Sequence, residues 1–169
     1  MREVIRMDKA AGDRPSDRAV LVGVDGSDAG RRALRWAFEE ARLRGLRLRA
    51  IGVVQLHLVA LSVPGYPYAD ETYINDLVAA TREEVAKEVA LIGADFPGVE
   101  ADVEAVLGTP AETLVEASEG AELLVVGSRG RGGFSGLLLG SVSQQVVSHA
   151  HVPVLVVRPP RHAKAAPES

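Results

Sequence analysis

A glycine-rich segment between two apolar runs constrains this chain more than any other feature of its sequence. It follows the apolar run 123–126, and four of the seven residues from Gly127 to Gly133 are glycines. A further glycine, Gly140, precedes a second apolar run over Val152–Val157. Glycine permits sharp turns and a close approach of the backbone to another molecule. The segment is therefore expected to connect two buried strands through a turn that holds a phosphate group.

The chemistry of the segment supports that expectation. A helix is expected over 141–150, and the free N–H groups at a helix N-terminus favour an anion. The Ser141 hydroxyl adds a donor, and the amides around Gly127 and Gly130 would approach the same anion as a nest. Arg129 and Arg131 would add positive charge. The alternative is a plain strand-to-helix connection, whose glycines serve only the geometry of the turn.

Two common phosphate-binding signatures do not match. A P-loop would have lysine after Gly132, where Gly133 stands, and no serine or threonine follows in register for magnesium. The first expected turn, 23–26, lacks the glycine fingerprint of dinucleotide-binding folds. A P-loop NTPase and an ordinary dinucleotide dehydrogenase are both disfavoured.

Composition narrows the class of protein further. The chain has 169 residues, no cysteine and a net charge of −4, so disulfides and cysteine-ligated zinc are excluded and nucleic acid is not an expected partner. No apolar run is long enough to span a membrane, and no secretory signal is evident, so a cytoplasmic location is expected. Residues 123–167 contain no acidic residue and carry +5, while the rest of the chain carries −9. This asymmetry favours a small anionic ligand for the positive part, although two strands and a short tail also leave little room for carboxylates.

Hydrophobic periodicity predicts strands that alternate with helices. An alternating strand over 99–107 is expected at a sheet edge, and Thr109, Pro110 and Glu112 predict a capped helix start with a capping box. The expected strands are 19–24, 46–54, 99–107, 121–126 and 152–157. Four helices are expected: the first is capped by Ser27 or Asp28, the second runs over 74–92, the third begins at Pro110, and the fourth runs over 141–150.

This alternation predicts an α/β fold, a single-domain open parallel five-stranded sheet with helices on both faces. The domain is expected over 18–158, between a disordered N-terminal arm (1–17) and a disordered C-terminal tail (159–169), and Gln55–Asp70 is expected to be mostly loop. Ligands of such folds lie beyond the carboxyl ends of the strands. The turns after Val24, Val54 and Val126 are therefore the candidate site.

Asp25 stands where the first strand meets its helix. There a carboxylate can accept hydrogen bonds from ribose hydroxyls or reach a metal held by phosphates. It can equally cap the helix, and both roles remain open on the residues alone.

Together these residues resemble the ATP-binding branch of the universal stress protein family. The family pattern is glycine, two residues, glycine, nine residues, glycine and then serine or threonine, and Gly127, Gly130, Gly140 and Ser141 match it with the spacing intact. The first-strand motif 22–27 and the segment 140–157 also match. The resemblance implies the sheet order 3-2-1-4-5, the Rossmann-like architecture of the adenine nucleotide alpha hydrolase-like folds, and a homodimer joined through Val152–Val157.

The resemblance also implies the roles of the site residues. Asp25 would contact the ribose or the phosphates, and a magnesium ion, if one accompanies the phosphates. Gly23 would let the first strand lie close to the nucleotide, the Val54 backbone would hold adenine, and the two glycine segments would wrap the triphosphate of ATP. The implied binding residues are Gly23, Asp25, Val54, Gly127, Ser128, Arg129, Gly130, Arg131, Gly132, Gly133, Gly140, Ser141, Val142 and Ser143.

The expected function is that of an ATP-binding universal stress protein, a nucleotide-dependent regulator in the stress response with little or no catalysis. No carboxylate that could act as a general base lies between 123 and 167, and no triad or carboxylate pair is evident elsewhere. The alternatives are a slow ATPase or nucleotidyl-transfer enzyme of the same architecture, and a stress protein that binds cyclic AMP or no nucleotide.

Overall fold

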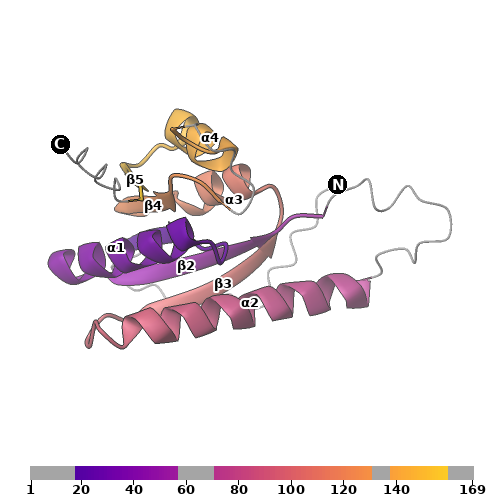
Figure 1. Cartoon of the computed structure of the whole chain (residues 1–169), viewed down its shortest axis with the longest axis horizontal. Coiled ribbons are helices and arrows are strands. Elements are labelled where there is room, and N and C mark those ends of the chain that lie inside the picture. The colour runs from indigo at the N-terminus through magenta and orange to yellow at the C-terminus, as the bar shows by residue number, and fades with distance from the viewer. Residues whose placement is uncertain (1–17, 57–70, 131–137, 160–169) are drawn as a thin grey trace, which may run out of the picture.

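The computed structural model describes residues 18–56, 71–130 and 138–159. In this part of the chain five strands alternate with four helices (Figure 1). The elements are β1 (Ala19–Gly23), α1 (Asp28–Arg44), β2 (Arg47–Val54), α2 (Glu71–Gly93), β3 (Ala101–Leu107), α3 (Pro110–Ala117), β4 (Leu123–Gly127), α4 (Ser141–His149) and β5 (Val154–Val157).

The strands form one parallel sheet in the order β3-β2-β1-β4-β5, which confirms the predicted fold class and strand order. The chain moves outward from β1 to β3 and then returns to the other side of β1 with β4. The switch in strand order therefore falls between β1 and β4, and a crevice at this point is where open α/β sheets bind ligands.

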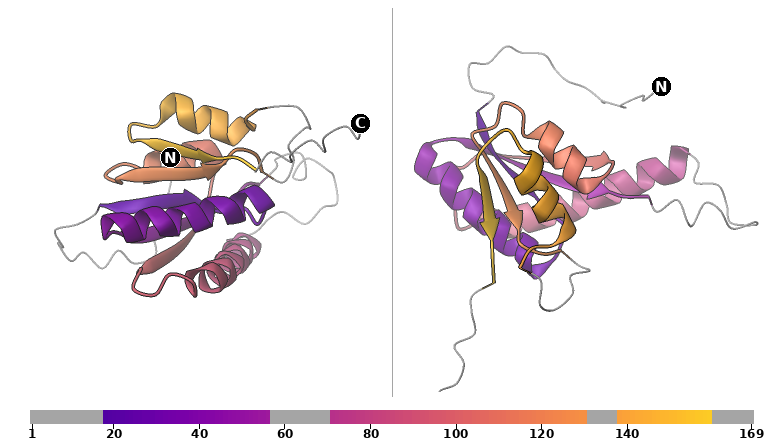
Figure 2. Two further views of the ribbon diagram at one scale, coloured as in Figure 1. Left: turned by 60° about the vertical axis from the view of Figure 1, so that its left-hand side comes forward. Right: turned by 90° about the horizontal axis from the view of Figure 1, so that it is seen from above.

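Helices cover both faces of the sheet. Side chains of α1 and α2 share a core with Val20, Val22 and Leu48, whereas side chains of α3 and α4 share a second core with Leu21 and Leu124. Viewed from above in Figure 2, β4 and β5 lie between α1 on one side and α3 and α4 on the other. The unbroken apolar sequences of β1 and β4 follow from this burial on both faces.

The ends of α1 follow the predicted signals. Ser27 is the N-cap, and its hydroxyl accepts a hydrogen bond from the Gly30 N–H. Gly45 ends the helix with φ of 63°, a left-handed conformation that glycine adopts without steric cost. Both caps position the turn between β1 and α1.

The capping box predicted for α3 is wrong. Thr109 is the N-cap residue, but its side chain makes no capping hydrogen bond, and Pro110 stands in the first helical turn as expected. Ala111 and Leu114 are buried, so packing on the sheet and the preset φ of proline define this helix start instead.

The apolar stripe of α2 is buried only in its second half. Val85, Val89 and Ile92 are buried, while Ile74 and Leu77 are half-buried. Strand β3 lies at an edge of the sheet, as its alternation predicted. The predicted arm (1–17), nearly all of the tail and most of the predicted loop Gln55–Asp70 lie outside the described residues. No helix within the described ranges is long and apolar enough to cross a membrane.

Candidate functional site

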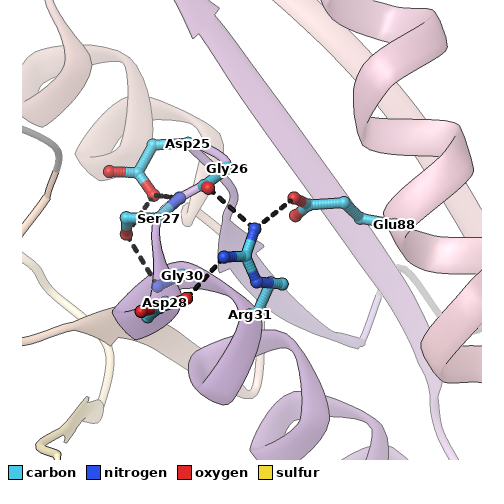
Figure 3. A network of polar contacts seen from close by, with 7 residues as sticks. All are labelled: Asp25, Gly26, Ser27, Asp28, Gly30, Arg31 and Glu88. Carbon is cyan, nitrogen blue, oxygen red and sulfur yellow. Dashed lines mark hydrogen bonds and ion pairs between the residues drawn. The ribbon is translucent and has the colours of Figure 1, made fainter.

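The turn between β1 and α1 holds Asp25 in a defined position. Its Oδ1 accepts hydrogen bonds from the Ser27 N–H (3.0 Å) and the Ser27 hydroxyl (2.6 Å), as Figure 3 shows. Gly26, with φ of 73°, allows the chain to turn between them. Asp25 therefore supports the cap residue rather than capping the helix itself. Its other carboxylate oxygen, Oδ2, makes no hydrogen bond or ion pair in the part of the chain that the structure describes.

The turn after β4 lies against this free oxygen. A Cβ atom added to Gly130 would come within 2.7 Å of Asp25 Oδ2, so only glycine leaves the observed space beside the carboxylate. At the start of the same turn, a Cβ on Gly127 would come within 2.9 Å of the backbone carbon of Ala29. Two segments about 100 residues apart in sequence thus meet at the strand-order switch, because β1 and β4 are paired neighbours.

Hydrogen bonds tie the glycine-rich turn to the N-terminus of α4. The Ser128 carbonyl accepts the Gly140 N–H (2.7 Å) and the Ser143 hydroxyl (2.9 Å), and the Ser128 N–H donates to the Val157 carbonyl (2.8 Å). Gly140 is the N-cap and provides no side-chain acceptor. The Gln144 N–H donates to the Gly140 carbonyl (3.0 Å), which closes the first turn of α4. The amides of the first turn are the donors that such a terminus offers to an anion.

Several predicted site residues have other neighbours in the fold. A Cβ on Gly23 would come within 2.8 Å of the Leu114 side chain, so α3, packed on the sheet, fills the space beside this glycine. The Val54 carbonyl accepts the Gly108 N–H (2.9 Å). Ser143 is buried, with its hydroxyl also 3.0 Å from the Gly140 carbonyl, so it positions the turn.

The remaining predicted residues divide into two groups. Arg129, Ser141 and Val142 lie in the turn after β4 or in the first turn of α4, as expected. Arg131, Gly132 and Gly133 lie outside the described residues.

A cleft of about 440 Å³ opens on the other side of Asp25, between the carboxyl ends of β1 and β2 and the helix α2. Val53 lines it, whereas Val54 does not. Sequence analysis missed the contribution of α2 to this cleft, since the α2 residues that line it precede the glycine-rich segment by some 40 positions and carry no motif. The only available signal was the polar residues interleaved with the apolar stripe. The lining residues are Val24, Asp25, Gly26, Val53, Thr81, Glu84, Val85, Lys87 and Glu88.

Arg31 connects the β1–α1 turn to α2 at this cleft (Figure 3). Its guanidinium donates to the Gly26 carbonyl (2.9 Å), to Asp28 (2.5 Å) and to Glu88 Oε1 (3.3 Å). The hydrogen bond to Asp28 makes the largest contribution to raising the pKa of Arg31, and Glu88 adds to it. The second oxygen of Glu88, Oε2, is buried and has no hydrogen-bond partner in the described part of the chain.

No cluster of three or more histidine, aspartate or glutamate side chains suited to a metal occurs in the described ranges 18–56, 71–130 and 138–159. A metal carried by phosphates needs fewer protein ligands, and Asp25 Oδ2 has the chemistry that Mg²⁺ prefers. The free oxygen of Asp25 therefore fits such an ion.

Comparison with known proteins identifies the family. The model of the universal stress protein family matches residues 18–158. The chain is 38% identical over 155 residues to the universal stress protein Rv2005c of Mycobacterium tuberculosis, covering 92% of this chain and 50% of the relative. It is 39% identical over 145 residues to Rv2623 of the same species, covering 85% and 46%. The chain thus spans about half the length of these curated relatives.

Solved structures agree. Universal stress protein UspA from Lactobacillus plantarum superposes with a TM-score of 0.69 at 25% identity, covering 86% of this chain and all of that one. A universal stress protein solved in complex with cAMP has a TM-score of 0.58 at 29% identity, covering 83% and 96%. The Archaeoglobus fulgidus protein in complex with dAMP has 0.56 at 27%, covering 83% and 97%. With its sheet order, its glycine-rich turn and the match over nearly all described residues, this chain belongs to the universal stress protein family.

Proposed function

We propose that this chain binds an adenine nucleotide, with ATP as its ligand, and acts as a nucleotide-dependent regulator in the stress response. The observation that carries the proposal is the meeting of Asp25 Oδ2 with the Gly130 turn beside the N-terminus of α4. Hydrogen-bond donors suited to phosphate thereby lie next to an acceptor suited to ribose hydroxyls or a cation. The cAMP and dAMP complexes of similar proteins support adenine nucleotides as the ligand class.

The roles within the site follow from their chemistry. The backbone amides of the turn and the first turn of α4 would hold the phosphates, with Ser141 as a further donor. Arg129 would neutralise charge, and Mg²⁺ would lie between the phosphates and Asp25. Gly132 and Gly133 would extend the phosphate-binding turn, and Arg131 its positive charge. Regulation requires only that the nucleotide-bound surface differ from the empty one.

Isothermal titration calorimetry with ATP, ADP, AMP and cyclic AMP tests the proposal. We expect ATP to bind, and we expect Gly130→Val to weaken binding by about tenfold or more, since its side chain displaces Asp25 and loses at least one charge-assisted hydrogen bond. Gly120→Asn is the matched control, because Gly120 lies at the opposite end of β4 with φ of 79°, a conformation that asparagine tolerates.

The titration has clear contrary outcomes. Absence of binding by all four nucleotides, or equal affinity in the Gly130→Val variant, contradicts the proposal. Tighter binding of cyclic AMP than of ATP reassigns the ligand within the same site. Steady-state ATP hydrolysis that Asp25→Ala abolishes would instead make the chain an enzyme.

We also propose that two copies of the chain pair through β5. The carbonyls of Pro153 and Val157 accept hydrogen bonds from β4, so in a parallel ladder the polar groups of Val154 and Val156 point to the open edge. An apolar edge strand with free N–H and C=O groups is a template for another strand.

A further inference from the structure

Glu88, which lines the cleft beside Asp25, has a buried oxygen without a partner among the described residues. Its Oε1 accepts a hydrogen bond from Arg31, whereas Oε2 accepts none from any residue that the structure describes. A buried carboxylate oxygen without a donor costs free energy, so native proteins rarely leave one unless a ligand or water satisfies it. The missing partner must be a donor.

The walls of the cleft suit a flat aromatic ring. Val24 and Val85 are buried and Val53 is half-buried, and all three line the cleft. Sites for small ligands combine apolar surface with polar groups, and the polar part of this lining is formed by Asp25, Thr81, Glu84, Lys87 and Glu88. Asp25 belongs both to this cleft and to the contact with Gly130. A nucleotide with its phosphates at the turn and its ribose at Asp25 can therefore place its base in the cleft.

The position of Glu88 is set from two directions. Arg31 joins it to the Gly26 carbonyl in the turn between β1 and α1, while α2 packs on β2, where a Cβ on Gly52 would meet Val85 at 2.8 Å. The side chain of Glu88 is 20% exposed. Its free oxygen is thus an oriented acceptor rather than a mobile surface charge.

From these contacts we propose that Glu88 determines base specificity, with Oε2 accepting a hydrogen bond from the exocyclic amino group of the base. The inference rests on the proposed function and goes beyond it, because it assigns the choice of base to a side chain of α2. Purines without an amino group would leave Oε2 unsatisfied. A site whose buried polar group expects a hydrogen bond rejects strongly the ligands that lack the donor.

The test compares ATP with purine riboside triphosphate, which carries hydrogen in place of the amino group. We expect the wild-type chain to bind ATP about tenfold to a hundredfold more tightly, as expected for one hydrogen bond to a charged group. In Glu88→Gln the amide oxygen remains with Arg31 and an NH₂ replaces Oε2, so the ratio of affinities should fall to near one. Glu83→Gln removes the same charge from α2 outside the cleft and should keep the wild-type ratio.

The ratio compares two ligands on one variant, so effects of the substitution on folding or phosphate binding cancel. A wild-type ratio near one, or a ratio that Glu88→Gln leaves unchanged, overturns the inference while nucleotide binding stands. Failure of the wild-type chain to bind either triphosphate overturns both the inference and the proposed function.

Discussion

Gly127 and Gly130 stand three residues apart in one turn, but the neighbours of their missing side chains differ. At Gly127 the neighbour is the backbone of Ala29, which cannot move without shifting α1 from the sheet. At Gly130 it is the end of the Asp25 side chain, which can rotate. The first glycine is therefore required by the fold, whereas the second leaves space beside the Asp25 carboxylate.

This difference predicts that alanine at Gly127 mainly lowers stability, whereas alanine at Gly130 mainly lowers nucleotide affinity. Gly127→Ala should lower the free energy of unfolding by about 1–3 kcal/mol, because its methyl group overpacks the contact between β4 and α1. Gly130→Ala should change stability less and lower nucleotide affinity. Urea denaturation followed by circular dichroism measures the first effect and calorimetry the second. Equal stability losses in the two variants would contradict the assignment.

At Asp25 the sequence left two roles open, and in the structure the two carboxylate oxygens have different neighbours. Oδ1 supports the cap residue Ser27, and Oδ2 faces the Gly130 turn. Spacing in the sequence could not show this, because the second neighbour arrives from β4. Gly23 is a similar case, because its neighbour Leu114 comes from α3 and the spacing around Gly23 suggests only a ligand.

Among the elements, α4 is hydrogen-bonded to the turn after β4 through the carbonyl of Ser128. Ser128 O accepts from both the Gly140 N–H and the Ser143 hydroxyl, and Ser143 is 2% exposed. The helix is short, so its own hydrogen bonds hold it weakly and tertiary contacts decide its position. An anion site built on its N-terminus needs this link.

Ser143→Ala should remove one of these two hydrogen bonds. We expect a loss of about 1 kcal/mol in the free energy of unfolding, the usual net value of one hydrogen bond, together with weaker nucleotide binding. Ser148→Ala is the control, since Ser148 lies on the same helix and its exposed hydroxyl bonds only to the Gln144 carbonyl. Chemical denaturation and calorimetry of both variants provide the measurement. A Ser143→Ala variant that matches Ser148→Ala in both quantities refutes the positioning role.

Prediction of elements worked where local chemistry decides the conformation. Ser27 and Gly45 bound α1 as expected, because caps act through neighbouring residues. At α3 the capping box did not form although its letters were present, because burial of Ala111 and Leu114 defined the helix start.

For the whole molecule, the open edge of β5 predicts the state of assembly. Val156→Pro removes an N–H that points away from β4, so the sheet should persist while pairing with a second copy is lost. Val156→Thr keeps the N–H and the branched shape and serves as the control. Light scattering coupled to size exclusion should give a dimer for the wild type and the threonine variant and a monomer for the proline variant. A dimeric proline variant with native circular dichroism places the interface elsewhere.

The sequence by itself determined the fold class, the family and the glycine-rich turn, because these depend on periodicity, composition and spacing along the chain. The structure bears out the class and the strand order. Only the tertiary structure decided that Gly130 faces Asp25, that Val53 rather than Val54 lines the cleft, and that Glu88 has a free oxygen there. The physical reason is that the parallel crossovers bring β1, β4 and α2 together from distant parts of the chain, and no local pattern records which side chains then meet.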